Sequence, residues 1–483
     1  MLSLLPLWVV LLRAPIFVRS AADWDESLYI LTASQWLEGH LPYTTVFDLK
    51  PVGIFAIFSV ALGLLGDAVL SIRLVTVLFV YATSGALFLL GRRLFGDVTS
   101  ALIAAFSYPV FTLGMEGLAS NTELFFIFFN IVGLLLLLSA LEQIGRRRWA
   151  HIFLAGLAFG VALQIKYIVV IEIGFFVIYF AWVGRLSVKQ VAQLAPVFTL
   201  GVVLPTGLAM FYFWANDLLD VFLYANFEAN RRYLGILSGE YWPGVRHSLQ
   251  DWVKWSWLAV TAIIWLEILG RPDTHYQLAR RFFLLWLLVG FLESWATLKF
   301  YPHYYLVTMA PLSLLLAGAV GRYPAAGGRR FTVGLLLILV LGFPFARTID
   351  KYYSPWIREY LARGDPDVIL ATYIRERIDP GDYIYVVNGH PIIYYLARAK
   401  LPTKYVLPPL ILSRDFSHVA GVAYPAEVDR IFSLQPRYIL VKDQREANKR
   451  LKEITDRLAG SYIPDSRIDD TTIYVRRDLD TSK

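Results

Sequence analysis

The feature that most constrains this chain is a series of long apolar segments that recurs from the N-terminus to about residue 347. Several of these segments approach the roughly 20 residues that a helix needs to cross a bilayer. Hydrophobic residues fill 57% of the 483 positions, which is typical of a polytopic membrane protein. The chain has no cysteine, so disulfides and thiol chemistry are excluded. The net charge of +7 does not indicate a nucleic-acid partner, because most basic residues of the apolar part lie in clusters between the apolar segments.

These basic clusters predict the topology. Arg146-Arg147-Arg148, for example, lies between two apolar segments, and the positive-inside rule places such clusters in the cytoplasm. This arrangement requires that Pro51–Leu65, which is short for a spanning helix, be a juxtamembrane or partly inserted helix. We therefore expect about eleven transmembrane helices in the cell membrane, with the N-terminus inside and everything after Asp350 outside.

The composition indicates two domains. Residues 1–348 are expected to form a transmembrane module whose first outer loop covers residues 19–67. After Lys351 the pattern becomes that of a soluble protein. Asp365–Arg377 is predicted to be an amphipathic helix capped by Asp365, and Tyr383–Val387 a buried strand. Helix and strand patterns then alternate, with further strands predicted at Tyr438–Val441 and Thr472–Val475, so residues 349–483 are predicted to be a small extracytoplasmic α/β domain.

The first outer loop carries many charges for a segment beside a membrane. Its charged side chains are those of Asp23, Asp25, Glu26, Asp48 and Lys50. Between them, Ile30–Leu37 predicts a short surface helix that ends at Gly39 and Pro42. Acidic groups near a membrane are costly and are commonly functional, although a solvated loop would look the same. The predicted topology brings charged groups from later loops to the same membrane face.

The types of charged residue favour group transfer from a phosphate-bearing sugar donor. Such a reaction needs a base for the acceptor's proton and cations for the departing phosphate. Asp25 and Glu26 are the leading candidates for the base. The candidate phosphate-binding cations are Lys50, Arg231, Arg232, Lys299 and His303. A divalent metal (Mg, Mn or Zn) held by carboxylates from two loops is a candidate cofactor.

Three other residues have two interpretations each. Glu123 is either a metal or substrate ligand, or a first-turn charge on a helix capped by Asn121. Lys166 either faces the donor phosphate or extends to the lipid headgroups. Tyr304 belongs either to an interfacial aromatic belt or to a platform for a sugar ring.

Several short motifs, in this order after the first span, resemble membrane glycosyltransferases of the C superfamily (GT-C). They are Asp25-Glu26-Ser27-Leu28-Tyr29, Glu38-Gly39-His40-Leu41-Pro42-Tyr43 and Asp48-Leu49-Lys50-Pro51. The nearest branch is the protein mannosyltransferase and aminoarabinose transferase type, whose bacterial relatives decorate envelope glycans. Thr122-Glu123-Leu124 is similar to a second-loop acidic position that is usually Asp, and Pro302-His303-Tyr304-Tyr305 resembles a late-loop motif.

The resemblance implies a polyprenyl-phosphate-linked sugar donor and inverting transfer to an envelope glycan, lipid or protein acceptor. Asp25 would be the base or would orient the acceptor. Glu26 and Asp48 would support it or bind metal, and Lys50 would bind the donor phosphate. Whether Asp25 or Asp48 is the base stays open.

The remaining assignments complete the predicted site. Asp25 and Glu123 are the candidate metal ligands, and Tyr29 and Tyr304 are expected to contact substrate. Two other classes of function are compatible with the chain: a transporter or flippase of polyprenyl lipids, and a non-catalytic scaffold that presents the α/β domain to partners.

Overall fold

The computed structural model describes residues 2–236, 241–270, 274–323, 329–443 and 448–479. The chain forms two compact units, each assembled from three stretches of sequence. The helical unit contains Met1–Ile16, Arg73–Tyr212 and Leu237–Pro355. The mixed unit contains Phe17–Ile72, Phe213–Ile236 and Trp356–Lys483. The predicted domain boundary at residue 348 stays a prediction.

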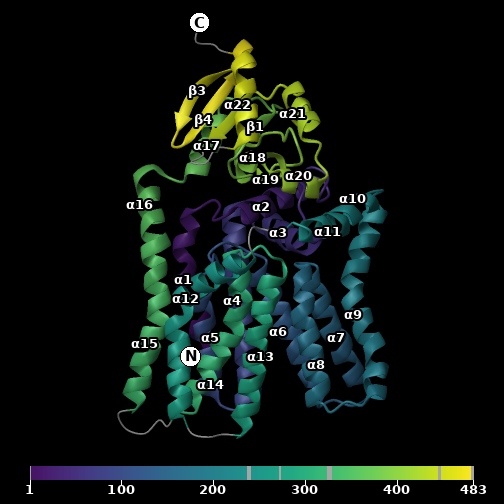
Figure 1. Ribbon diagram of the computed structural model, residues 1–483, viewed down its shortest axis with the longest axis vertical. Coiled ribbons are helices and arrows are strands. Elements are labelled where there is room, and N and C mark those ends of the chain that lie inside the picture. The colour runs from purple at the N-terminus through teal and green to yellow at the C-terminus, as the bar shows by residue number, and fades with distance from the viewer. Residues whose placement is uncertain (1, 237–240, 271–273, 324–328, 444–447, 480–483) are drawn as a thin grey trace. The chain divides into compact units, whose positions relative to one another are not determined.

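The helical unit is built from long apolar helices that lie roughly parallel in Figure 1. Its α-helices are α1 (Leu5–Arg13), α4 (Ala68–Phe95), α5 (Val98–Phe111), α6 (Glu123–Ala140), α7 (Gly145–Leu163), α8 (Val170–Val183), α9 (Val188–Trp214), α12 (Tyr241–Leu269), α13 (Thr274–Ala296), α14 (Met309–Gly321) and α15 (Arg329–Thr348). Short 3-10 or π segments are η1 (Leu2–Leu4), η2 (Ala14–Val18), η3 (Tyr167–Val169), η5 (Pro302–Thr308) and η6 (Ile349–Tyr353).

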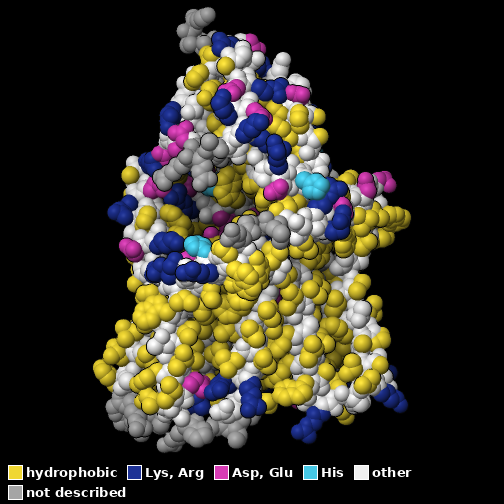
Figure 2. All heavy atoms as spheres, in the orientation of Figure 1, with side chains coloured by type: hydrophobic (Ala, Val, Ile, Leu, Met, Phe, Trp, Pro, Cys, Tyr) yellow, Lys and Arg dark blue, Asp and Glu magenta, His cyan; other side chains and the backbone are white. Residues whose placement is uncertain are grey.

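Six helical segments of the described chain are long and apolar enough to cross a membrane. They are Val69–Phe95, Glu123–Ala140, Val188–Trp214, Tyr241–Leu269, Pro302–Gly321 and Phe331–Arg375. Shorter apolar helices include Val52–Leu65 and Val98–Phe111. Figure 2 shows hydrophobic side chains covering much of the surface of the helices. The expected class of helical membrane protein is therefore confirmed.

Close helix packing in this unit depends on small residues. α14 is buried from Met309 to Val320 and packs against α5, α12 and α13. On α7, a Cβ added at Gly156 would lie 2.2 Å from the carbonyl oxygen of Phe198 on α9. A Cβ at Gly160 would likewise lie 2.4 Å from the carbonyl oxygen of Val202. Glycines four residues apart thus let α7 and α9 approach backbone to backbone, as is common for helices in membranes.

The mixed unit combines the first outer loop with the C-terminal region. Its α-helices are α2 (Trp24–Leu37), α3 (Val52–Leu65), α10 (Leu219–Leu223), α11 (Ala229–Leu234), α16 (Ser354–Arg363), α17 (Pro366–Arg375), α18 (Ile392–Ala397), α19 (Pro409–Leu412), α20 (Arg414–Ala420), α21 (Tyr424–Ser433) and α22 (Lys449–Ser461). Its other elements are η4 (Tyr224–Glu228), η7 (Arg477–Leu479), β1 (Ile384–Val386), β2 (Tyr438–Lys442), β3 (Tyr462–Ile468) and β4 (Thr471–Arg476).

The four strands form one mixed sheet in the order β1-β2-β4-β3. β1 and β2 are parallel, with Ile384 opposite Tyr438, whereas β4 is antiparallel to both β2 and β3. The expected strands at 383–387, 438–441 and 472–475 are present. β3 was not expected, because its polar sequence resembles that of a loop.

The helix α2 belongs to the core of the mixed unit. Leu28 and Leu31 pack in the same apolar cluster as Ile384 and Val386 of the sheet and Ile374 of α17. The expectation of a short surface helix is therefore wrong: α2 begins earlier, at Trp24, and is buried from Glu26 to Ser34. The sequence suggested exposure because the sheet and α17, which cover α2, lie more than 300 residues away in the chain.

The N-cap of α17 offers a test of this packing. Asp365 accepts hydrogen bonds from Val368 N at 3.1 Å and from the Ser20 hydroxyl at 2.8 Å, as a buried side chain. We expect Asp365→Ala to destabilise the mixed unit by about 2 kcal/mol, because it removes both the cap and the bond to Ser20. Thermal unfolding followed by fluorescence would measure the loss. Asp379→Ala, which removes an exposed partner of Arg437, should change stability by less than about 0.5 kcal/mol.

Candidate functional site

A capping arrangement fixes the beginning of α2. The Asp23 carboxylate accepts the backbone N–H of Glu26 at 2.8 Å, and the Glu26 carboxylate accepts the N–H of Ala22 at 2.9 Å. Glu26 is completely buried. Such reciprocal bonds satisfy N–H groups that a helix end would otherwise leave unpaired. Glu26, predicted from sequence as a catalytic carboxylate, therefore lies where it holds the helix end that presents Asp25.

Asp25, in the first turn of α2, is paired with Lys50 from the loop before α3. Lys50 Nζ lies 3.1 Å from Asp25 Oδ2, and the Tyr29 hydroxyl donates to the same oxygen at 3.2 Å. Lys50 Nζ also lies 5.7 Å from the centre of the Tyr29 ring. Burial raises the pKa of Tyr29 well above its usual value, so the phenol stays a donor. The Asp25 side chain remains 26% exposed, which leaves room for a substrate hydroxyl.

Two residues hold the loop that carries Lys50. The hydroxyl of the buried Tyr43 donates to the carbonyl of Lys50 at 2.8 Å, and Asn230 of α11 donates to the carbonyl of Leu49 at 2.9 Å. Tyr43 has a φ of +72°, which is uncommon for a residue with a side chain. The resemblance motif included Tyr43 without a role, and Asn230 was not singled out. Tyr43 and Asn230 hold the loop through hydrogen bonds to backbone carbonyls, and residue types alone do not reveal such contacts.

Asp48 is a buried carboxylate beside this pair. One of its oxygens accepts the N–H of Leu49 at 2.6 Å, and the other has no hydrogen-bond partner among the described residues. Burial raises the pKa of Asp48 to about 6; Lys50 opposes this rise and the charge of Asp25 adds to it. A carboxylate with a pKa near neutrality and an unused oxygen is typical of a functional site.

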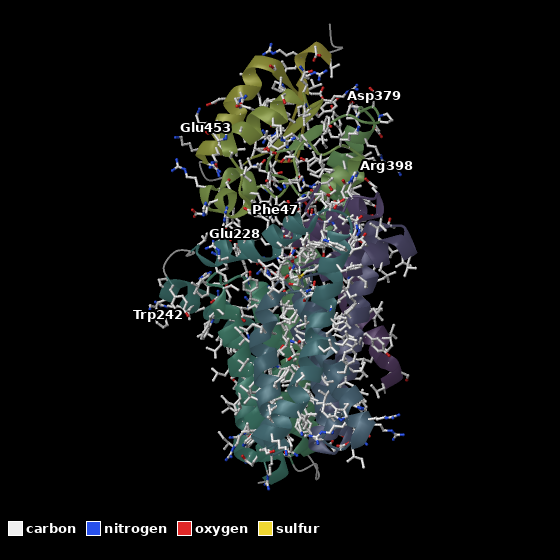
Figure 3. The ribbon with its side chains drawn as sticks, turned by 90° about the vertical axis from the view of Figure 1, so that its right-hand side faces the viewer. Phe47, Glu228, Trp242, Asp379, Arg398 and Glu453 are labelled. Atoms are coloured by element: carbon white, nitrogen blue, oxygen red, sulfur yellow. The ribbon has the colours of Figure 1, made fainter. Side chains whose placement is uncertain are left out.

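Arg231 and Arg232 are engaged elsewhere in the mixed unit. Both guanidinium groups bind Glu228, each at 2.8 Å, and these hydrogen bonds lower the pKa of Glu228 to about 2. Arg232 also donates to the carbonyl of His418 at 3.1 Å, which links α11 to α20. Glu228 is labelled in Figure 3. The structure thus places both arginines in a surface network that joins two helices.

In the helical unit, a second polar group forms around Lys166. Lys166 makes a buried ion pair with Glu123 at the start of α6, and its Nζ lies 3.8 Å from the centre of the Tyr304 ring. Thr122 Oγ1 donates to the other Glu123 oxygen at 3.1 Å. The predicted alternatives for Lys166 included extension to the headgroups, which is wrong because the side chain is 9% exposed. Asn121 is not the cap of α6, because its side chain donates to the carbonyl of Glu116 instead.

His303 and Glu116 lie in the same unit and contact each other. His303 Nδ1 is 2.9 Å from Glu116 Oε2, and the His303 ring packs edge-on against Tyr304. Segments that are far apart in sequence are therefore joined through Glu116, Glu123, Lys166, His303 and Tyr304. Lys299 is also buried, in the loop between α13 and η5. The pairing of Glu116 with His303 was not predicted.

The candidate metal ligands belong to different units: Asp25 lies in the mixed unit and Glu123 in the helical unit. Within the part of the chain that the structure describes, no group of three or more His, Cys, Asp or Glu side chains is placed to hold a metal ion. Glu123 is instead bound to Lys166. The assignment of Asp25 and Glu123 as metal ligands therefore stays a prediction.

Comparison with known proteins places these features in a family context. The model of the dolichyl-phosphate-mannose-protein mannosyltransferase family matches residues 49–208. An undecaprenyl phosphate-alpha-4-amino-4-deoxy-L-arabinose arabinosyl transferase of Pseudomonas aeruginosa (strain LESB58) is 26% identical over 325 residues, which cover 61% of this chain and 55% of that protein. The chain spans about half the length of the curated relatives it matches.

Solved structures show the same architecture. ArnT from Cupriavidus metallidurans bound to undecaprenyl phosphate superposes with a TM-score of 0.66 at 15% identity, over 97% of this chain and 96% of that one. The oligosaccharyltransferase of Archaeoglobus fulgidus in complex with Zn and sulfate gives a TM-score of 0.52 at 13% identity, over 91% and 67%. Identities this low establish the fold alone.

The class that the fold and the family match define is that of multi-pass membrane proteins with an ArnT-like fold. The resemblance to GT-C membrane glycosyltransferases, predicted from the loop motifs, is confirmed by the mannosyltransferase family match and the arabinosyl transferase relatives.

The raised pKa of Asp48 predicts opposite effects on activity and stability. We expect turnover to fall as the pH drops through about 6, because Asp48 loses the charge that balances Lys50. In Asp48→Asn this acidic limb should disappear from the pH–rate profile. An unchanged limb in the variant would contradict the assignment.

Stability should respond in the reverse direction. Because the folded-state pKa of Asp48 is raised, its protonated form stabilises the fold below about pH 4, and this contribution is lost as the pH rises through about 6. Asp48→Asn should therefore be more stable than the wild type at pH 8, by up to about 3 kcal/mol, and not at pH 4. Thermal unfolding at the two pH values measures the difference.

The ion pair in the helical unit can be tested by a double-mutant cycle. Glu123→Gln and Lys166→Met should each destabilise by about 3–5 kcal/mol, because each leaves one buried charge without its partner. The double variant should recover most of this loss. If Lys166 also contacts substrate, the double variant will be stable but inactive. Recovery of activity with stability would show a purely structural pair.

Proposed function

We propose that this protein is a glycosyltransferase that moves a sugar from a polyprenyl-phosphate donor to an envelope glycan, lipid or protein acceptor. The observation that carries the proposal is the Lys50–Asp25 ion pair beside the buried Asp48 carboxylate. Asp25 lies in the first turn of α2, and Asp48 and Lys50 lie in the loop between α2 and α3. The match to the mannosyltransferase family model and the relation to arabinosyl transferases support the donor class.

In the proposed reaction, Asp25 accepts the proton of the acceptor hydroxyl. Its carboxylate is partly exposed, whereas that of Asp48 is buried, so a hydroxyl reaches Asp25 more readily. The acceptor oxygen bonds to the anomeric carbon as the bond from that carbon to the phosphate oxygen breaks. Polyprenyl phosphate leaves, and attack opposite the leaving group inverts the anomeric centre. Asp48 sets the charge around Lys50 while Asp25 gains its proton.

Cations stabilise the departing phosphate in this proposal. Lys50 is the primary candidate, because binding a phosphate would replace or extend its contact with Asp25. Lys166 is the candidate in the helical unit, where the Tyr304 ring supports its ammonium group. Lys299 and His303 stay further candidates for phosphate binding. Arg231 and Arg232 have weaker support, because Glu228 binds both.

We further propose that the chain crosses the cell membrane about eleven times. The helical unit contains eleven α-helices among the described residues, and the basic clusters favour a cytoplasmic N-terminus. The loop with Asp25 and the C-terminal sheet are then extracytoplasmic, where a lipid-linked sugar of the outer leaflet is available. Membrane lipids surround the apolar helices.

Donor consumption is the test. Purified protein in lipid nanodiscs is incubated with a panel of polyprenyl-phosphate sugars and membrane acceptor extract, with and without EDTA. We expect one donor to be consumed, and we expect Asp25→Asn to lower turnover by about 10²–10⁴-fold. Asp97→Asn, which replaces the N-cap of α5 by another good cap, is the matched control and should keep wild-type turnover.

The other classes of function give different results. A scaffold would consume no donor, and a flippase would move labelled lipid across the bilayer without releasing sugar. Loss of activity in EDTA that Mg, Mn or Zn restores would establish a metal requirement. Full activity of Asp25→Asn would overturn the assignment of the base while leaving the transferase intact.

A further inference from the structure

The mixed unit contains a cleft that the proposed reaction does not use. Its volume is about 1210 Å³, larger than the roughly 300–1,000 Å³ of sites for drug-sized ligands. Its walls come from the C-terminal half of α2, the loop after it, α18 and the segment 398–405. The space is sufficient for several sugar rings.

Four basic residues of the lining carry unused positive charge. They are Arg375, Arg398, Lys400 and Lys404. Their side chains make no hydrogen bond or ion pair within the described part of the chain, and Arg398 is labelled in Figure 3. Three of the four lie within seven consecutive positions, so the charge is concentrated on one wall.

The acidic residues of the lining are, by contrast, already engaged. Glu38 accepts a hydrogen bond from Gln35 at 2.8 Å, and Asp67 accepts the N–H of Leu70 at 2.8 Å. Glu427 binds Arg430 through both carboxylate oxygens. The lining therefore presents a surplus of positive charge to a ligand, which favours an anion.

Aromatic side chains accompany these cations. Tyr383 and Tyr405 line the cleft with partly exposed rings. Lys404 Nζ lies 5.4 Å from the centre of the Tyr405 ring, and burial lowers the pKa of Lys404 from its usual value. A half-buried lysine on an aromatic ring gains from an anionic partner. Tyrosine rings with hydroxyl groups suit the mixed apolar and polar faces of sugars.

The cleft is connected to the candidate site by short pieces of backbone. Phe47 N donates to the carbonyl of Lys404 at 2.8 Å, and Phe47 directly precedes Asp48. Along α2, Asp25 and Gln35 are ten residues apart, which corresponds to about 15 Å of helix. This separation is within the length of a saccharide of a few residues.

We propose that this cleft binds the negatively charged saccharide part of the acceptor. The inference rests on the proposed transferase function and names the class of its acceptor: a glycan with carboxylate or phosphate groups. Arg398 and Lys400 bind the acidic groups, and the tyrosines contact the rings. Another part of the same glycan then presents its hydroxyl to Asp25.

Binding of defined sugars tests the proposal without turnover. Intact protein in phosphatidylcholine nanodiscs is titrated with trigalacturonic acid, with maltotriose monophosphate and with neutral maltotriose. We expect at least one charged trisaccharide to bind about tenfold more tightly than maltotriose, and the better one identifies the acidic group. In Arg398→Gln/Lys400→Gln this binding should weaken about tenfold or more.

Two variants control for indirect effects. Lys452→Gln/Arg457→Gln removes the same charges from the exposed side of α22 and should bind like the wild type. Arg398→Lys/Lys400→Arg keeps both charges and should retain binding. Equal binding by the wild type and the Gln variant would overturn the proposal. So would preferential binding of glycerol phosphate, which would assign the cleft to a lipid headgroup.

The proposed function can fail separately from this inference. Asp25→Asn should bind the charged sugar normally although its turnover is about 10²–10⁴-fold lower. In the transfer assay, Arg398→Gln/Lys400→Gln should raise the acceptor KM about tenfold and leave the donor KM unchanged. A raised donor KM would mean that the cleft serves the donor, which would contradict the acceptor assignment. If the protein binds the charged sugar but consumes no donor, the proposed transferase function is refuted and the binding site in the cleft is not.

Discussion

The burial of α2 in the core of the mixed unit is the constraint on which the candidate site depends. An isolated helix of 14 residues is marginal in water, so packing must supply its stability. Leu28 and Leu31 provide it by sharing one apolar cluster with the sheet, and the Ser27 hydroxyl accepts the N–H of Ile392 at 2.7 Å. Asp25 is therefore positioned by residues from the far end of the chain. The same helix contributes Gln35 to the cleft, so one packing interaction places both the candidate base and a wall of the proposed acceptor site.

The buried charge of Asp48 in the candidate site lowers the stability of the fold at neutral pH. Asp48 stays ionised at neutral pH although burial opposes its charge, and only Lys50 and two backbone N–H groups offset that cost. Tyr43 and Asn230 donate hydrogen bonds to the backbone of the loop, and these bonds keep Lys50 against Asp25. Such preorganisation suits the proposed transferase function, because cations aimed at a departing phosphate help most when they do not have to move. In the helical unit, Glu123 and Lys166 neutralise each other at low exposure, where either charge alone would be costly.

The sequence predicted what depends on composition and local pattern. Apolar runs predicted the helices of the membrane module, and Asp365 before Pro366 predicted a capped helix that begins where expected. The loop motifs predicted the family resemblance and brought attention to Asp25, Asp48 and Lys50. Contacts between distant segments were beyond its reach, because the packing of α2 against the sheet joins segments about 350 residues apart. The pairs of Glu228 with Arg231 and Arg232 are local, three and four residues apart on a helix, and this spacing is visible in the sequence. Glu26 has the residue type of a catalyst, but it stands three residues after Asp23, which is the spacing of a capping pair, and its bond to Ala22 N shows that role.

The central claim is that a buried carboxylate beside the Lys50–Asp25 pair carries its charge near neutral pH. Infrared difference spectroscopy of the intact protein in nanodiscs, titrated between pH 4 and 8, measures carboxyl protonation directly. We predict a protonated carboxyl signal that disappears with a midpoint near pH 6, is absent from Asp48→Asn and has a higher midpoint in Lys50→Met. If the midpoint near pH 6 is unchanged in Asp48→Asn, or if every carboxyl titrates below about pH 5, the electrostatic account of this site is contradicted.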